Sequence, residues 1–273
     1  MKGEHAEILE LLRSLAARAS KVILEVYNAP FEVELKGPAD PVTLADKRAN
    51  ELIVTELARA FPRVPIVAEE SAAQEYAGYA GAERAFFIDP VDGTNEFVKK
   101  SGEFCVMLGY VEHGRAVLGV IDAPILGKRF EGIVGGDATV IDRDGSSRPL
   151  GVSSVRFSDG LAVVSRSHRS QKTDAALDKL GIGSREQYGS AGLKAMRIAD
   201  GSALVYLHAG YAGARWDAAA PEAIAVAAGA SYTDLQGVPY RYDDGEIGNV
   251  RGILAVPNLL FDEAQELLRG GTP

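Results

Sequence analysis

The sequence is arranged around one stretch, Ala85-Phe86-Phe87-Ile88-Asp89-Pro90-Val91-Asp92-Gly93-Thr94-Asn95-Glu96. It opens with a short apolar run at residues 86–88, which predicts a buried strand. Asp89 and Asp92 follow, and the proline between them is expected to end the strand and stiffen the turn. The polar residues from Asn95 onward predict a helix with Thr94 as its N-cap.

Two carboxylates at the end of a strand suit a cation, and the free backbone N–H groups at a helix start suit a phosphate. The alternative is an Asp-rich turn in which Asp89 and Asp92 only cap the backbone and face solvent, because Asp and Gly are common in turns. These residues by themselves leave both interpretations open.

The composition is that of a globular protein, with 273 residues, 47% hydrophobic and 25% charged. A chain of this length can bury a substantial core in one large domain or two packed halves. The net charge of −9 argues against binding to a nucleic-acid polymer, which clustered Lys and Arg would hold. An acidic chain can still bind a small anion where metal ions reverse the local charge.

The single cysteine, Cys105, excludes an intramolecular disulfide, and its apolar neighbours predict a buried strand residue rather than a nucleophile. The residues at the N-terminus lack an apolar signal region, and no apolar run approaches the length of a membrane span. We therefore expect a cytoplasmic protein without membrane contact.

Hydrophobic periodicity and turn residues predict alternating helices and strands. The predicted helices cover residues 4–27, 43–60, 172–180, 193–199, 217–228 and 261–268. The predicted strands cover residues 31–35, 66–68, 86–88, 104–111, 116–122, 129–134, 138–141, 161–165 and 203–207, with a loop expected at 36–41. The strands between 104 and 141 are expected to form an antiparallel meander. The polar segment 142–149 predicts a boundary between an N-terminal half, 1–145, and a C-terminal half, 146–273, within one compact unit.

Carboxylates recur at the ends of predicted elements. Glu69 and Asp89 each follow an apolar strand, and Asp217 lies at the start of a helix. Mg²⁺ takes oxygen ligands, and carboxylates that converge from separate elements can hold two ions about 3.5–4 Å apart. Considered singly, Asp217 is also typical of a helix N-cap and Glu69 of a surface charge.

Four ordered motifs resemble those of the inositol monophosphatase superfamily, whose members are lithium-sensitive, Mg²⁺-dependent phosphomonoesterases. Residues 89–94 resemble the first signature, and Trp216-Asp217-Ala218-Ala219-Ala220 resembles the second. Glu69-Glu70-Ser71 stands about twenty residues before the first signature, and residues 41–46 resemble the upstream helix motif. The resemblance implies an α+β fold, a layered αβαβα sandwich, and covers most of the chain.

The resemblance also implies roles for individual residues. The implied metal ligands are the carboxylates of Glu69, Asp89, Asp92 and Asp217 and the backbone carbonyl of Val91. The implied catalytic residues are Glu69 together with a dyad, Thr94 and Asp46, that orients the attacking water. The backbone N–H groups of Gly93 and Thr94 are expected to receive the phosphate. The cofactor would be two or three Mg²⁺ ions, and lithium would inhibit the enzyme.

Several stretches resemble the 3′(2′),5′-bisphosphate nucleotidase branch, which removes the 3′-phosphate of 3′-phosphoadenosine 5′-phosphate and is linked to sulfur assimilation. They are Asn95-Glu96-Phe97, Gly102-Glu103-Phe104, Ser165-Arg166-Ser167-His168 and the turn at 189–194, which matches the Gly-Ser-Ala-Gly form of actinobacterial members. The substrate-binding residues implied in addition to Gly93 and Thr94 are Asn95, Ser165, His168, Ser190 and Lys194. His168 is equally consistent with a solvated helix entrance, and Lys194 with an amphipathic side chain that reaches solvent.

Three positions depart from known patterns. Gly210 stands where inositol-selective members carry a glutamate, which counts against inositol phosphate as the main substrate. Asn95 replaces a basic residue of the nucleotidase branch, and Pro221, expected in a first helical turn, replaces a frequent Gly of the second signature. A broad phosphatase for inositol phosphate or fructose 1,6-bisphosphate remains the alternative. In either case we expect a small phosphorylated substrate and a monomer or a homodimer.

Overall fold

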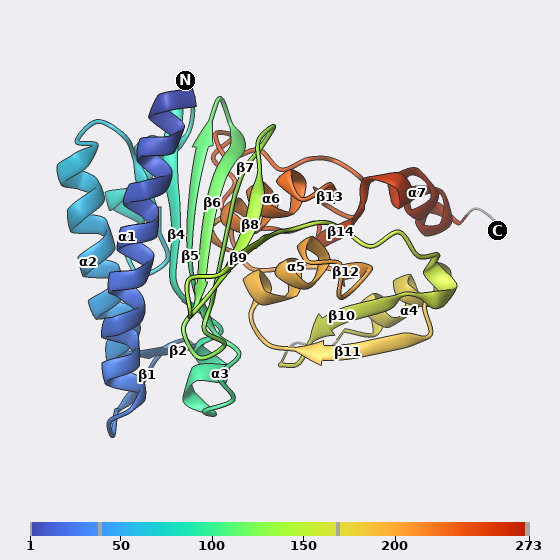
Figure 1. Cartoon of the computed structure of the whole chain (residues 1–273), viewed down its shortest axis with the longest axis horizontal. Helices are drawn as coiled ribbons and strands as arrows, with labels where there is room; N and C mark the ends of the chain where they lie inside the picture. Colours follow the sequence, from blue (N-terminus) through green and yellow to red (C-terminus); the bar gives the residue numbers. More distant parts are fainter. Residues whose placement is uncertain (1, 38–39, 168–169, 271–273) are drawn as a thin grey trace.

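Helices and sheets alternate in layers in the computed structural model, which describes residues 2–37, 40–167 and 170–270. From one side of the molecule to the other, Figure 1 shows helices α1 and α2, a first sheet, helices α5 and α6, a second sheet, and helices α4 and α7. The expected αβαβα sandwich is confirmed.

The outer helices α1 (Lys2–Tyr27) and α2 (Leu44–Ala60) cover one face of the first sheet. Each helix has apolar residues at helical spacing, and these are the residues that it buries against the sheet, such as Leu12 and Ile53. The N-cap of α2 is Thr43, whose backbone N–H donates to the Asp46 carboxylate at 2.8 Å.

The first sheet has seven strands in chain order. They are β3 (Ile66–Ala68), β4 (Arg84–Asp92), β5 (Cys105–Glu112), β6 (Arg115–Ala123), β7 (Lys128–Ile133), β8 (Ala138–Asp142) and β9 (Ser147–Pro149). β3 and β4 are parallel, and the other neighbouring pairs of this sheet are antiparallel. The strands β5 to β8 form the expected antiparallel meander.

A row of glycines crosses this sheet under the inner helix α6 (Trp216–Ala227). Gly109, Gly119 and Gly132 are partners in register on β5, β6 and β7. A Cβ on Gly119 would lie 2.5 Å from the carbonyl oxygen of Ala220 in α6. The glycines therefore let the helix backbone rest directly on the sheet, and this seating fixes the position of Asp217 in the first turn of α6.

We expect Gly119→Ala to destabilise the protein by about 1–3 kcal/mol, because the added methyl group must push α6 away from the sheet. Urea unfolding measures the change. Gly151→Ala is the matched control, since a Cβ there meets nothing within 4 Å, and its free energy of unfolding should stay within about 0.5 kcal/mol of wild type. An unchanged stability in Gly119→Ala would contradict the tight seating of α6.

The second sheet has five strands in the order β11-β10-β12-β14-β13. They are β11 (Ser184–Tyr188), β10 (Leu161–Ser165), β12 (Val205–His208), β14 (Ile253–Pro257) and β13 (Ala230–Thr233). Helix α5 (Ala191–Ala199) lies with α6 between the sheets, and α4 (Gln171–Lys179) and α7 (Phe261–Arg269) cover the outer face.

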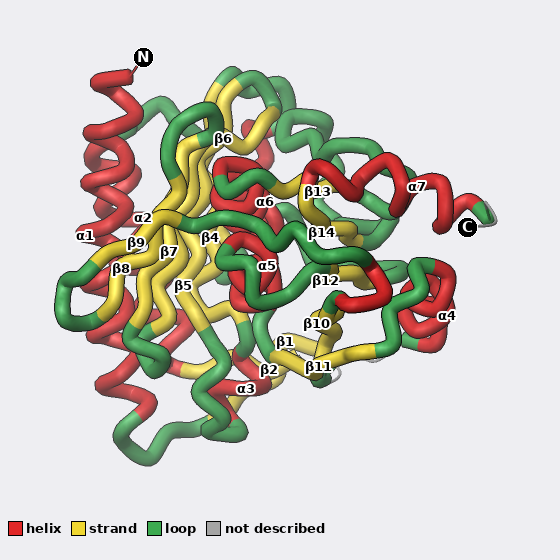
Figure 2. Tube along the Cα trace, turned by 45° about the vertical axis from the view of Figure 1, so that its right-hand side comes forward, coloured by secondary structure: helices red, strands yellow, loops and turns green. Residues whose placement is uncertain are grey.

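The structure corrects several predictions near the central stretch. In the expected loop at 36–41, residues 36–37 and 40–41 belong to two antiparallel strands, β1 (Val33–Gly37) and β2 (Asp40–Thr43), which lie beside α3 in Figure 2. Strand β4 continues past Pro90 to Asp92, with an irregular register between Asp89 and Asp92. Proline has no N–H to donate, so this irregularity is where the sheet accommodates it.

Two helix starts also differ from the prediction. Helix α3 (Thr94–Val98) has Gly93 rather than Thr94 as its N-cap, and Gly93 has the left-handed backbone conformation, φ 97°, that favours glycine. Pro221 lies in the second turn of α6, not in the first, so it cannot donate a backbone hydrogen bond to the carbonyl of Asp217.

The predicted boundary segment 142–149 contains strand β9, which pairs with β8 and so belongs to the first sheet. The division of the chain at residue 145 stays a prediction. Strands β11, β13 and β14 were not predicted.

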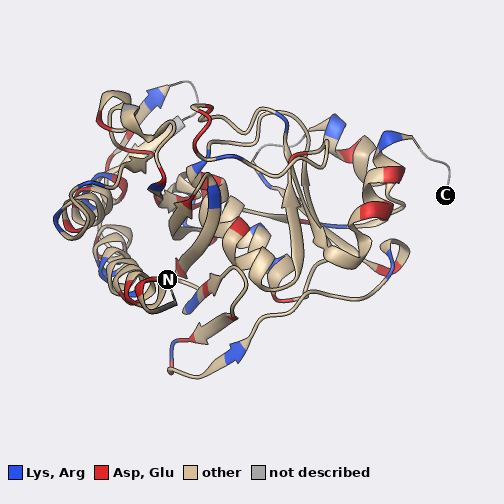
Figure 3. Ribbon diagram, turned by 90° about the horizontal axis from the view of Figure 1, so that it is seen from above, with Lys and Arg blue, Asp and Glu red and all other residues tan. Residues whose placement is uncertain are grey.

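Acidic and basic residues are interspersed over the helices and loops (Figure 3). Among the described residues, no helix is long and apolar enough to span a membrane.

Candidate active site

Three carboxylates meet at one edge of the first sheet. Asp89 and Asp92 lie at the end of β4, and Asp217 reaches them from the first turn of α6. Each of the three offers an oxygen within 4.8 Å of the others. An oxygen-only donor set of this kind suits a hard cation such as Mg²⁺.

The electrostatics of this acidic cluster favour a bound cation. Burial, followed by the charges of neighbouring carboxylates, raises the pKa of Asp89 and of Asp217 well above the usual range. Like charges at this separation cannot all ionise in a buried site without a compensating charge. The residues present therefore fit a divalent metal.

Glu69 lies next to this cluster because β3 and β4 are parallel and end at the same edge of the sheet. Besides burial, the charge of its carboxylate is one of the causes that raise the pKa of Asp89, and the Lys36 ammonium of β1 donates to it at 2.9 Å. The backbone carbonyl of Val91, also a predicted ligand, accepts a hydrogen bond from the Thr94 hydroxyl at 3.1 Å.

The predicted dyad is brought together by the capping of α2. The Thr94 hydroxyl lies 3.1 Å from one oxygen of Asp46, and the other oxygen accepts hydrogen bonds from the backbone and hydroxyl of Thr43. Asp46 is buried, and this burial raises the pKa of its carboxyl. The hydrogen bonds from Thr43 thus hold the Asp46 carboxylate in one orientation, with its other oxygen facing Thr94.

Asp92 is fixed by the start of α5, which sequence reasoning did not find. Its carboxylate accepts hydrogen bonds from the backbone N–H of Ala191 at 3.0 Å and of Gly192 at 2.7 Å, and from the Ser190 hydroxyl. The hydroxyl of Ser190, a residue predicted to bind substrate, therefore donates its hydrogen bond to Asp92. A side chain at Gly192 would press on the Asp92 carboxylate, because its Cβ would lie 3.2 Å from Oδ2.

A cleft of about 290 Å³ opens beside the acidic cluster. Its lining includes eight predicted site residues: Asp92, Gly93, Thr94, Asn95, Ser165, Ser190, Lys194 and Asp217. Asp46, Glu69, Asp89 and Val91 are not among the lining residues, and His168 falls outside the described residues.

The cleft lining also includes residues that were not predicted, among them Glu96, Tyr206, His208 and Tyr211. Tyr211 is 65% exposed, and glycines with positive φ precede and follow it at positions 210 and 213. An aromatic side chain in a loop with such glycines is the sequence signal that could have pointed to it.

Lys194 lines the cleft but is almost fully buried. The side chain is buried, its ammonium donates to the carbonyl of Ser190 at 2.6 Å, and it lies 5.4 Å from the centre of the Tyr206 ring. Burial lowers its pKa, against the raising effect of nearby carboxylates, Asp92 first among them. The structure therefore contradicts a side chain that reaches solvent at Lys194.

A larger cavity, about 710 Å³, lies between α1 and the strands β7 and β8. It is lined by residues such as Arg13, Arg129 and Glu131, and the acidic cluster does not border it. The smaller cleft is the candidate active site because the convergent carboxylates and the Thr94–Asp46 pair lie there.

A buried group of carboxylates on a layered αβαβα fold defines a class of metal-dependent phosphatases. Residues 4–265 match the model of the inositol monophosphatase family, and the chain belongs to this family. Two solved structures share the fold: extragenic suppressor protein suhB from Bartonella henselae and an IMPase from Thermotoga maritima. The first is 26% identical with a TM-score of 0.80, covering 97% of this chain and 100% of the other. The second is 25% identical with a TM-score of 0.80, covering 96% and 97%.

Curated relatives point to one branch of the family. The chain is 34% identical over 241 residues to the 3′(2′),5′-bisphosphate nucleotidase CysQ of Escherichia coli strain K12. The aligned region covers 88% of this chain and 95% of the relative. The chain is 36% identical over 242 residues, with the same coverage, to the protein of that name from Salmonella typhimurium.

Proposed function

We propose that this protein is a Mg²⁺-dependent 3′(2′),5′-bisphosphate nucleotidase that converts 3′-phosphoadenosine 5′-phosphate to AMP and phosphate. The observation that carries the proposal is the acidic cluster of Asp89, Asp92 and Asp217 beside a cleft lined by Thr94 and Lys194. The names of the curated relatives support this substrate, as do the motifs shared with the nucleotidase branch.

Asp89, Asp92 and Asp217 would hold the metal together with Glu69 and the carbonyl of Val91, as two or three ions. When bound, the metal supplies the positive charge that offsets the phosphoryl group. The chain's own residues then position the reactants. The Thr94 hydroxyl accepts a hydrogen bond from the attacking water and donates to Asp46, which lies 3.1 Å away.

The backbone N–H groups of Gly93 and Thr94 would bind the phosphate that is transferred. Water attacks phosphorus and gives up a proton through the Thr94 hydroxyl to Asp46, while the bond to the ribose 3′-oxygen breaks. That oxygen takes up a proton from solvent, and Asp46 returns its proton to solvent. Asn95, Ser165 and Lys194 would contact the rest of the nucleotide beside Ser190, whose hydroxyl donates to Asp92, and His168 would contact the base. We further propose a cytoplasmic enzyme of sulfur assimilation, inhibited by lithium and active as a monomer or a homodimer.

The test is phosphate release with Mg²⁺ from 3′-phosphoadenosine 5′-phosphate, inositol 1-phosphate and fructose 1,6-bisphosphate. We expect kcat/KM for the nucleotide to exceed that of either sugar phosphate by at least about tenfold, a difference of about 1.4 kcal/mol in transition-state binding. Equal or higher values for a sugar phosphate would contradict the nucleotide assignment and favour a broad sugar phosphatase on the same acidic cluster.

A further inference from the structure

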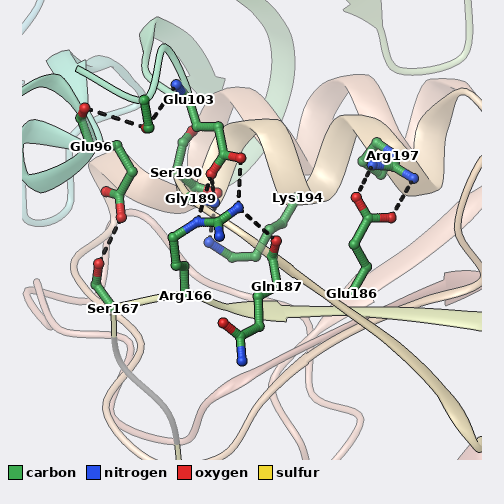
Figure 4. A network of polar contacts seen from close by, with 11 residues as sticks. Glu96, Glu103, Arg166, Ser167, Glu186, Gln187, Gly189, Ser190, Lys194 and Arg197 are labelled. Atoms are coloured by element: carbon green, nitrogen blue, oxygen red, sulfur yellow. Dashed lines mark hydrogen bonds and ion pairs between the residues drawn. The ribbon is translucent and has the colours of Figure 1, made fainter. Parts of the chain in front are cut away.

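One carboxylate ties the two loops at the mouth of the cleft to the N-terminal half of the chain. Glu103, between α3 and β5, accepts hydrogen bonds from Arg166 Nε at 3.1 Å and Nη2 at 2.7 Å (Figure 4). Its Oε2 also accepts from the backbone N–H of Gly189 at 2.7 Å. Arg166 follows β10 and Gly189 follows β11, so one side chain holds the ends of two parallel neighbouring strands.

A second carboxylate strengthens this tie. Glu96, which is buried, accepts a hydrogen bond from the Ser167 hydroxyl at 2.6 Å. Gly189 packs directly on both glutamates, since a Cβ there would collide with Glu96 Cγ and lie 2.9 Å from Glu103 Oε2. The four stretches that resemble the nucleotidase branch are therefore joined physically: residues 96 and 103 on one side meet residues 166, 167 and 189 on the other.

These contacts of Glu103 and Glu96 are expected to contribute little to the stability of the fold. The Arg166 side chain is 41% exposed and that of Glu103 17%, and ion pairs with such exposure contribute about 0–1 kcal/mol to stability. The same contacts do fix the position of residues that line the cleft. Ser165 directly precedes Arg166 in the chain, and Gly189 is followed by Ser190, whose carbonyl holds the Lys194 ammonium.

We propose that Glu103 is a positioning residue for substrate specificity. Through Arg166 and Gly189 it fixes residues 165–167 and 189–194 in the arrangement that receives the base and the 5′-phosphate of the nucleotide. This inference rests on the proposed nucleotidase function. The phosphate that is transferred would contact other residues, Gly93 and Thr94, and Asp92 keeps its own hydrogen bonds from Ala191 and Gly192 at the start of α5. We therefore expect the loss of Glu103 to affect substrate binding more than the chemical step.

The test compares kcat and KM of Glu103→Ala with 3′-phosphoadenosine 5′-phosphate and with p-nitrophenyl phosphate, which has neither a ribose nor a second phosphate. We expect KM for the nucleotide to rise about tenfold, with kcat within about threefold of wild type and kcat/KM for p-nitrophenyl phosphate unchanged. Glu103→Gln keeps one acceptor oxygen and should show a smaller rise in KM. Urea unfolding should give a similar stability for both variants.

The matched control is Glu186→Gln. Glu186 forms a comparable ion pair with Arg197, at 3.0 Å and 3.2 Å, in the same part of the structure (Figure 4), but neither residue lines the cleft. Its kinetics with both substrates should match wild type.

An unchanged nucleotide KM in Glu103→Ala would overturn the inference, and so would an equal loss of kcat with both substrates. A wild-type protein that does not prefer the nucleotide contradicts the proposed function instead. In that case a rise in KM for the preferred substrate still supports a positioning role for Glu103, and an unchanged KM overturns it.

Discussion

Asp89→Asn is expected to lower kcat by at least about a thousandfold, because the amide removes one anionic ligand from the acidic cluster on which charge neutralisation depends. The same change should stabilise the protein in the absence of metal. Burial and neighbouring carboxylates raise the pKa of Asp89, so ionisation lowers the stability of the folded state as the pH rises through this raised pKa. Asparagine carries no such cost at neutral pH.

The two effects are measured separately. Phosphate release gives the loss of kcat, and thermal unfolding of metal-stripped protein gives the gain in stability. Added Mg²⁺ should raise the unfolding temperature of wild type and have much less effect on the variant.

Asp122→Asn is the matched control for Asp89→Asn. The Asp122 carboxyl is partly buried, and this burial raises its pKa, but it faces α1, where it accepts a hydrogen bond from Ser20 at 2.9 Å. Its kcat should match wild type. Mg²⁺-dependent turnover retained in Asp89→Asn would contradict the assignment of Asp89 as a metal ligand.

Thr94→Val is expected to lower kcat by about a hundredfold or more with little change in KM, since general-base assistance typically contributes about 10²–10⁴-fold. Valine keeps the shape of threonine but has no hydroxyl to link the attacking water to Asp46. Thr94→Ser keeps the hydroxyl that lies 3.1 Å from Asp46 and should retain most of the activity.

The Thr94 hydroxyl also lies 3.1 Å from the carbonyl of Val91, so its loss could act through local structure. Unfolding of the metal-free variant, together with the Mg²⁺-induced shift in unfolding temperature, checks that the fold and the metal site persist. A kcat within threefold of wild type would contradict the dyad, and a change confined to KM would show that the hydroxyl serves binding.

The sequence predicts those parts of the site that lie within a short stretch of chain. Apolar strands that end in Glu69 and Asp89 give a local signal, and so does the cap of α2 that holds Asp46. The meeting of Asp217 with these residues depends on the seating of α6 on the glycine row, which is a tertiary packing effect. That meeting could be expected only through the family resemblance.

The parts that sequence reasoning missed depend on contacts between distant segments. The hydrogen bonds from the start of α5 to Asp92 join residues about a hundred positions apart, and no local pattern reports them. The paired strands β1 and β2 contain Gly37 and Pro41, residue types that normally indicate a loop. Strand β11, Ser184–Tyr188, is polar and lies at a sheet edge, so it lacks an apolar run. In β14, by contrast, the apolar run Ile253–Pro257 is a local signal from which a strand could have been predicted.

The most direct test of a metal-dependent nucleotidase uses protein stripped of metal with a chelator and then dialysed. Phosphate release from 3′-phosphoadenosine 5′-phosphate is measured before and after Mg²⁺ is added. We predict no release above background without metal, and full activity once Mg²⁺ is restored. Undiminished release by the stripped protein would contradict the central role given to Asp89, Asp92 and Asp217.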